Sequence, residues 1–141
     1  MEASVGGPPH PERLRFQDFT FERLASGRCR ARVVLSWADG RQFVGEAEGV
    51  ISQAGELRCS AAAAVRALER VVHPKVGFEL LGIKAVRAFD ATVVIVSLSA
   101  RTDTSVSRLV GSYLAATDSQ KGAALAVLNA TNRMLGNYYS R

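Results

Sequence analysis

The strongest constraint on the fold is an internal repeat that spans most of the sequence. Three short patterns rich in Ala, Val and Gly recur about sixty residues later, and the small differences in spacing fit insertions in loops. Self-similarity at one fixed distance indicates two copies of a supersecondary unit. The equivalent loops of such copies usually lie side by side around a pseudo-twofold axis. The recurring segments are 31–36 and 91–96, 43–45 and 109–111, and 67–70 and 130–133.

Each copy is predicted to contain three strands followed by one helix. Apolar segments bounded by Gly and Asp predict strands, and apolar residues at helical spacing predict helices. We therefore expect an α+β fold in which two βββα repeats, 13–75 and 76–141, form antiparallel sheet with both helices packed on one face and a pseudo-twofold relation. The expected strands are 15–24, 29–37, 42–50, 78–89, 92–100 and 107–114, and the expected helices are 56–72 and 119–137.

The composition is that of one ordinary globular domain. The 141 residues are 48% apolar and 22% charged, which suffices for a single core. Segment 1–12 is rich in Gly and Pro and is interpreted as a disordered leader outside the domain 13–141. No apolar run approaches the roughly 20 residues of a membrane span and no signal peptide is recognised, so we expect a cytoplasmic protein without membrane contact. The two cysteines, Cys29 and Cys59, are expected to be reduced thiols.

Asp39 and Gly40 separate two expected strands and predict a tight hairpin. Both central residues of a type I′ turn need a positive φ, which Asp and Gly tolerate better than most residues. We therefore expect a hairpin at these two positions.

The middle strand of each copy is apolar on both faces. Val93 and Ile95 oppose Val94 and Val96, whereas an antiparallel sheet with one wet face alternates apolar with polar residues. The helices cover one face, so a second copy of the chain, packed sheet to sheet or through exchanged strands, is the economical cover for the other. A long loop or a strongly curled sheet is the alternative. The candidate contacts of such a homodimer are Val34, Val94 and Val96.

No catalytic or metal-binding constellation is recognised in the sequence. The histidines are His10, in the leader, and His73, at a helix end where an imidazolium interacts favourably with the helix dipole. Nucleophile-elbow, zinc-protease and phosphate-loop motifs do not occur. We therefore expect neither a cofactor nor a metal. A small enzyme that uses Asp118, Glu46 or Glu48 stays open as an alternative.

The junction before the last helix is the strongest candidate for ligand binding. Thr117 and Asp118 lie where a helix N-cap belongs, and the free N–H groups of a first helical turn favour an anion such as a carboxylate. The alternative is that either residue only caps the helix. Asn129 and Asn132 are unfavourable inside a helix, so they are expected to make polar contacts or to be solvated. The candidate ligand-binding residues are Gly45, Gly49, Gly111, Ser112, Thr117 and Asp118.

This last helix resembles the end of the C-terminal regulatory domain of 2-isopropylmalate synthase and its citramalate synthase relatives. Thr117 and Asp118 match the Thr-Asp pair that opens the helix in that family, and residues 128–133 match its Leu-Asn-Ala-x-Asn-Arg pattern. The resemblance implies two βββα units, a homodimer, and an end-product amino acid bound near the ends of strands and helices. The first repeat departs from the family at 49–55, which lacks the Gly-x-Gly-Pro and Val-Asp-Ala segments, and the catalytic barrel is not part of this sequence. The resemblance thus implies a freestanding regulatory module whose candidate ligand is an amino acid or a related carboxylate.

Nucleic-acid binding is the second hypothesis. The net charge is +5, and Arg28, Arg30 and Arg32 alternate along one expected strand, so they project from one face. Clustered cations bind phosphates. However, no aromatic residues alternate with these arginines for base stacking, and cations at a strand end also discourage aggregation. We therefore rank a non-catalytic homodimeric module for small-molecule sensing or assembly first and a nucleic-acid-binding protein second.

Overall fold

The elements follow the predicted βββα order twice, which confirms the α+β fold class. The computed structural model describes residues 14–139, and the expected leader lies outside them. No helix within this part of the chain is long and apolar enough to cross a membrane. The elements are β1 (Arg15–Arg23), the 3₁₀ turn η1 (Ala25–Gly27), β2 (Arg28–Ser36), β3 (Gln42–Val50), α1 (Gln53–Val72), β4 (Gly77–Ala88), β5 (Ala91–Arg101), β6 (Val106–Ala115) and α2 (Ser119–Tyr139).

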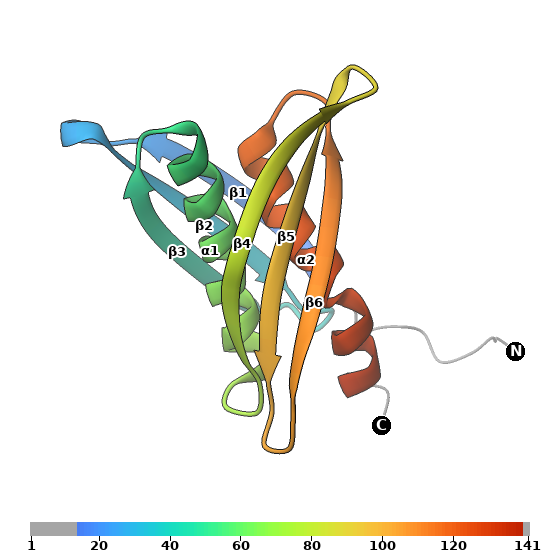
Figure 1. Cartoon of the computed structure of the whole chain (residues 1–141). Coiled ribbons are helices and arrows are strands. Elements are labelled where there is room, and N and C mark those ends of the chain that lie inside the picture. Colours follow the sequence, from blue (N-terminus) through green and yellow to red (C-terminus); the bar gives the residue numbers. More distant parts are fainter. Residues whose placement is uncertain (1–13, 140–141) are drawn as a thin grey trace, which may run out of the picture.

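The strands form two three-stranded antiparallel sheets, ordered β1-β2-β3 and β4-β5-β6, rather than one continuous sheet. Hairpins join consecutive strands, so every strand finds its partners within its own repeat. α1 packs on β2 and β3 and also contacts β4, α2 packs on β5 and β6, and the two helices contact each other. The helices therefore lie between the two sheets, each on the inner face of its own sheet (Figure 1).

One continuous apolar core joins the two repeats. Its largest fully buried side chains include Leu35 of the first sheet, Leu98 of the second and Leu68 of α1. α1 begins after Ser52, whose Oγ accepts the N–H of Gly55 at 2.9 Å and so satisfies one free donor of the first turn. Alanines line the inner faces of both helices, and their small side chains allow each helix to approach its sheet closely.

Two glycines show that the repeats are structurally equivalent. Gly45 of β3 lies directly beneath α1, and Gly111 of β6 lies directly beneath α2, so that a Cβ on either glycine would overlap the helix backbone. The recurrence of 43–45 in 109–111 therefore reflects one packing requirement that is met twice. The helix residues that such a Cβ would meet are Ala63 and Ala67 for Gly45, and Ala126 and Ala130 for Gly111.

The structure matches the residues of β2 to those of β5 in a different register from the one that the sequence repeat suggests. Gly45 pairs with Val33, and Gly111 pairs with Val96, so Val96 is the structural counterpart of Val33. The sequence match places Val93 there, three positions earlier. Because successive residues of a strand face opposite sides, an odd shift of register exchanges the two faces.

This shift corrects the predicted dimer contacts. Val94 and Val96 point toward the helices and are 0% exposed, so they are not available to a second copy. The side chain of Val34 points to the opposite face of the sheet from those of Val33 and Leu35, but it is only 5% exposed. The large apolar residues of β5 that face outward are Val93 and Ile95.

The hairpin predicted at Asp39 and Gly40 joins β2 to β3. Gly40 has a φ of 94°, but Asp39 does not have a positive φ, so their turn is not type I′; it closes with the N–H of Gly40 donating to the O of Trp37 at 2.9 Å. The two-residue turn with positive φ at both positions joins β4 to β5 instead. It consists of Phe89 (55°) and Asp90 (61°), and a phenylalanine in this region of φ is strained.

Candidate functional site

The six residues predicted to bind a ligand do not form one site. Gly45 and Gly49 lie on β3 of the first sheet, whereas Gly111 and Ser112 lie on β6 of the second. Gly111 is buried beneath α2, where it serves close packing. Gly45 has the same packing role beneath α1, but it also borders a surface hollow.

Asp118 caps α2, in agreement with the alternative interpretation of the helix start. Its Oδ1 accepts the N–H of Lys121 at 3.0 Å, and its backbone O accepts the N–H of Gly122 at 2.9 Å. A carboxylate of the chain thus occupies the place that a ligand carboxylate would take at this helix end, and a second anion would be repelled. Thr117 is exposed beside it.

Asn129 makes a specific polar contact of the kind expected for an Asn inside a helix. Its Oδ1 accepts the backbone N–H of Ser112, on the edge strand β6, at 3.1 Å. The corresponding contact of the first repeat comes from Arg66 of α1, whose Nη1 donates to the backbone O of Glu46 on β3 at 2.6 Å. In both repeats a helix side chain therefore bonds the open edge of the third strand, once as acceptor and once as donor.

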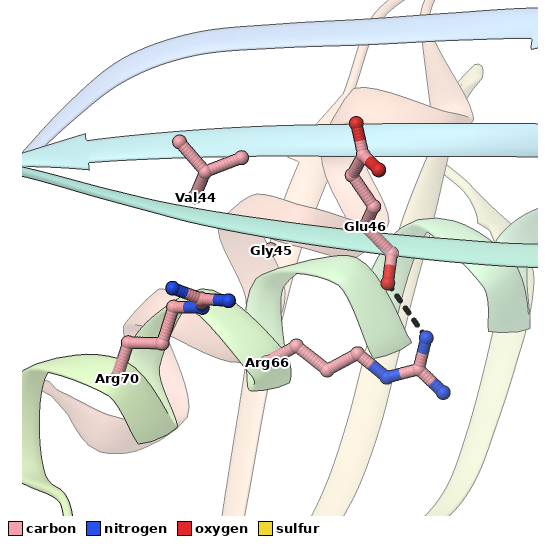
Figure 2. Close-up of a pocket in the computed structure, with 5 residues that line it drawn as sticks. All are labelled: Val44, Gly45, Glu46, Arg66 and Arg70. Carbon is pink, nitrogen blue, oxygen red and sulfur yellow. Dashed lines mark hydrogen bonds between the residues drawn. The ribbon is translucent and has the colours of Figure 1, made fainter.

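A hollow of about 280 Å³ lies beside the Arg66 contact, between α1 and β3 (Figure 2). Arg66 and Arg70 belong to consecutive turns of α1 and extend along the strand. Arg70 has no hydrogen-bond or ion-pair partner within residues 14–139. The carboxylate of Glu46 points away from the hollow and pairs with Arg32 at 3.4 Å. The hollow therefore has a surplus of positive charge.

The outer face of the first sheet is a ladder of ion pairs. The hydrogen bond from Arg30, and then that from Arg28, lower the pKa of the Glu48 carboxyl, and the same bond to Glu48 raises the pKa of Arg30. Three arginines here meet three glutamates, so the face lacks the surplus charge that phosphate binding needs. The pairs are Arg28 with Glu48, Arg30 with Glu48, Arg30 with Glu22, and Arg32 with Glu46, at N···O distances of 3.0 to 3.4 Å.

The outer face of the second sheet is apolar at most of the equivalent positions, although Ser112 replaces Glu46 and Lys84 lies beside Ile95. Where the first sheet has Arg32 and Glu48, the second has Ile95, which is 37% exposed, and Leu114, which is 62% exposed. At the end of this surface Phe89 projects from its turn and is 99% exposed. We call the surface the apolar face; it consists of Val86, Val93, Ile95, Val110 and Leu114.

Glu56 connects the two repeats and was not singled out by the sequence. Its side chain is only 10% exposed, and its Oε1 accepts from Arg23 of β1 at 3.1 Å and from Gln120 of α2 at 2.8 Å. A carboxylate is also favourable in the first turn of α1. Because all three residues are far apart in the sequence, no local pattern marks this contact.

Cys29 and Cys59 are buried free thiols in the core between β2 and α1. Burial, and then the neighbouring Cys29, raise the pKa of Cys59 to about 11. The Sγ of Cys59 donates to the backbone O of Ala47 at 3.1 Å. Across residues 14–139, no three His, Cys, Asp or Glu side chains gather as a metal site would require.

Comparison with known proteins adds no family: neither a family model nor a curated protein matches the sequence. The resemblance to the synthase regulatory domain therefore depends on the motif of the last helix. The βββα architecture is compatible with that resemblance. Function is accordingly inferred from the surfaces described above.

Proposed function

We propose that this chain is a homodimeric assembly module whose interface is the apolar face of the second sheet. The contrast between the two outer faces carries the proposal, because equivalent positions hold paired Arg and Glu on one sheet and exposed Val, Ile and Leu on the other. Exposed apolar residues on a sheet face indicate an interaction surface, whereas an ion-paired face is stable in water. Lys84 and Ser112 flank Ile95 on the neighbouring strands, so the apolar residues are grouped rather than continuous. Self-association is also what the resemblance to the synthase regulatory domain implies.

Two charged residues beyond the apolar face favour a second copy as the partner. Glu79 of β4 and Arg108 of β6 both pair with Ser99 of β5, so the three residues form one row across the outer face. Within the described part of the chain, neither charged residue has an ion-pair partner. A twofold axis parallel to β5 lays β4 of one copy over β6 of the other. It brings Glu79 opposite the partner's Arg108 and, by symmetry, Arg108 opposite the partner's Glu79.

The same axis lays the apolar row nearest the exposed turn on the same row of the partner, and it places Lys84 of β4 opposite the partner's Ser112. Val86, Val93 and Leu114 form a row near the exposed turn, and in this dimer Val86 faces the partner's Leu114. Two sheets pack face to face about 10 Å apart with interdigitating side chains. A twofold axis perpendicular to the strands would instead place this apolar row against the row that contains Glu79 and Arg108. That arrangement is unfavourable, because it buries charges against apolar side chains.

The size of the apolar face predicts a weak dimer. Three strands about 4.8 Å apart, with about ten residues of 3.3 Å each, give a flat footprint of about 475 Å² per copy. Side chains that project from the sheet, and the exposed Phe89, add to this area, but a standard interface buries about 800 Å² per partner. We therefore expect a dissociation constant in the micromolar range, about 1–100 µM.

Sedimentation velocity over about 1–300 µM protein tests the dimer. The unmodified chain should change from monomer to dimer within this range. Val110→Lys places a charge on the apolar face at a residue that is 65% exposed, so it should fold normally and raise the dissociation constant at least tenfold. Thr20→Lys, the matched control on the exposed outer face of the first sheet, should leave association unchanged. A monomer at the highest concentration, or equal effects of the two variants, would contradict the proposal.

Charge exchange tests the orientation separately. Glu79→Arg or Arg108→Glu alone should weaken the dimer, because each opposes like charges across the axis. The double variant should restore it. If the single variants associate like the unmodified chain while Val110→Lys does not, the apolar face is the interface but the proposed axis is wrong.

A further inference from the structure

We propose that the first repeat contains a binding site for the carboxylate group of a small molecule, in the hollow between α1 and the open edge of β3. Its donors are the backbone N–H of Glu46 and the guanidinium groups of Arg66 and Arg70. The inference goes beyond self-association and does not depend on it, because the hollow belongs to the first repeat and the proposed interface to the second sheet (Figures 1 and 2).

The backbone of Glu46 faces the open edge of the first sheet. In an antiparallel pair, residues alternate between those whose N–H and C=O point to the neighbouring strand and those whose groups point away. The N–H of Ile51 donates to the O of Gly27 at 2.9 Å, which places the odd-numbered residues of β3 in the ladder with β2. Glu46 therefore points away from β2. Its C=O accepts from Arg66, whereas its N–H has no acceptor within residues 14–139.

In the second repeat, a helix side chain accepts the hydrogen bond of the equivalent backbone N–H. Ser112 is the counterpart of Glu46, and its N–H donates to the carboxamide oxygen of Asn129 at 3.1 Å. Arg66 occupies the helix position equivalent to Asn129, since Ala63 and Ala126 contact the equivalent glycines. The first repeat thus has the equivalent backbone N–H, that of Glu46, but lacks the side-chain oxygen that would accept its hydrogen bond. A carboxylate is isosteric with a carboxamide, so a ligand carboxylate fits the place that the Asn129 side chain fills in the second repeat.

The charges around the hollow favour an anion there. Arg66 and Arg70 are one helical turn apart, where like charges repel each other, and a carboxylate between them relieves the repulsion. Two nearby acids are already engaged, because Glu69 accepts the N–H of Phe78 at 2.9 Å and Glu46 pairs with Arg32. A guanidinium presents several N–H donors in one plane, which suits a carboxylate.

The dimensions limit the ligand to a small molecule. The hollow of about 280 Å³ lies just below the usual range of ligand pockets, about 300–1,000 Å³. Val44 also borders the hollow, but its side chain points to the same side of β3 as that of Glu46, away from α1. We therefore assign a small carboxylic acid as the class of ligand.

NMR titration of the ¹⁵N-labelled full chain tests the site. Sodium acetate and sodium propionate are added at constant ionic strength, with sodium chloride as the balancing salt. The amide of Glu46 and the Nε–H groups of Arg66 and Arg70 should shift saturably, while the amide of Ser112, which already has its acceptor, should not. Without ligand, the Glu46 amide should exchange with water faster than that of Ser112. A linear response equal to that of chloride would overturn the site, and tighter binding of inorganic phosphate than of either acid would overturn the carboxylate assignment.

Three variants make the test specific. Arg66→Asn gives the first repeat the arrangement of the second, so it should abolish binding while the melting temperature is retained. Arg70→Ala removes an exposed side chain and should weaken binding at least tenfold. Arg58→Ala is the matched control on the same helix, because that guanidinium bonds the backbone O of Leu80 at 3.5 Å, and its binding should be unchanged. Acetate binding to Arg70→Ala at the original affinity, or to a folded Arg66→Asn, would overturn the proposal.

Discussion

Replacing Gly45 by alanine tests whether α1 rests directly on β3. The new Cβ would overlap the backbone O of Ala63 and the backbone N of Ala67, both inside the 3.0 Å that real Cβ contacts respect. These are backbone atoms of a buried helix and cannot rotate away as the end of a long side chain can. Either α1 must therefore move outward or β3 must bend.

The size of the effect follows from two opposing contributions. Overpacking a tight core lowers the free energy of unfolding by about 1–3 kcal/mol, and we expect the upper end because backbone atoms must move. Alanine recovers about 0.5–1 kcal/mol, because it restricts the unfolded chain more than glycine does. The expected net loss is about 2–2.5 kcal/mol, a large fraction of the roughly 5–15 kcal/mol that a domain has.

Urea unfolding followed by circular dichroism measures this loss. With a slope of about 1–3 kcal/mol per molar urea, the midpoint should fall by about 0.7–2.5 M. Gly111→Ala should behave in the same way, since it meets α2 equivalently. Gly82→Ala is the control, because a Cβ there meets nothing within 4 Å. Equal midpoints for Gly45→Ala and Gly82→Ala would refute the close approach of helix and strand.

Three further predictions concern titratable groups. Glu56→Ala should lower the free energy of unfolding by about 1.5–3 kcal/mol in the same urea assay, because it leaves two donors from different elements without their charged acceptor. Because Arg30 lowers the pKa of Glu48, this carboxylate stabilises the fold above the ordinary carboxyl pKa, and its contribution is lost as the pH falls through the lowered value. Glu48→Gln should therefore flatten the acid side of the melting-temperature profile. Because burial raises the pKa of Cys59 to about 11, both thiols should resist Ellman's reagent at pH 8 until urea is added. The stabilisation by neutral Cys59 should be complete below the ordinary thiol pKa and disappear as the pH rises through about 11.

Much of the fold was predictable from short-range patterns. The strand at Gln42–Val50 and the start of the last helix at Ser119 agree with the predicted boundaries, because apolar periodicity and the acidic cap act locally. The recurrence of Gly45 in Gly111 also marked a real packing requirement. The alignment of the two middle strands was less secure, because runs of Val and Ala match in several registers.

The candidate site was mostly not predictable. Asp118 has a side chain suited to both capping and ligand binding, and only the bond to Lys121 decides between them. Arg28, Arg30 and Arg32 were correctly placed on one face, but their acidic partners come from the two flanking strands. Arg66 and Arg70 gave no sequence signal, because two arginines one turn apart are ordinary on an exposed helix.

The sequence by itself determined the two βββα units, since each strand, helix and hairpin depends on residues near one another in the chain. Tertiary structure decided that the strands form two sheets with both helices between them, which brings Glu56 to Gln120 across the repeats. It also decided which face of β5 is buried, because that choice depends on where α2 meets Gly111. Which face of a strand is buried depends on how the sheets and helices pack together. The sequence of a strand that is apolar on both faces does not determine it.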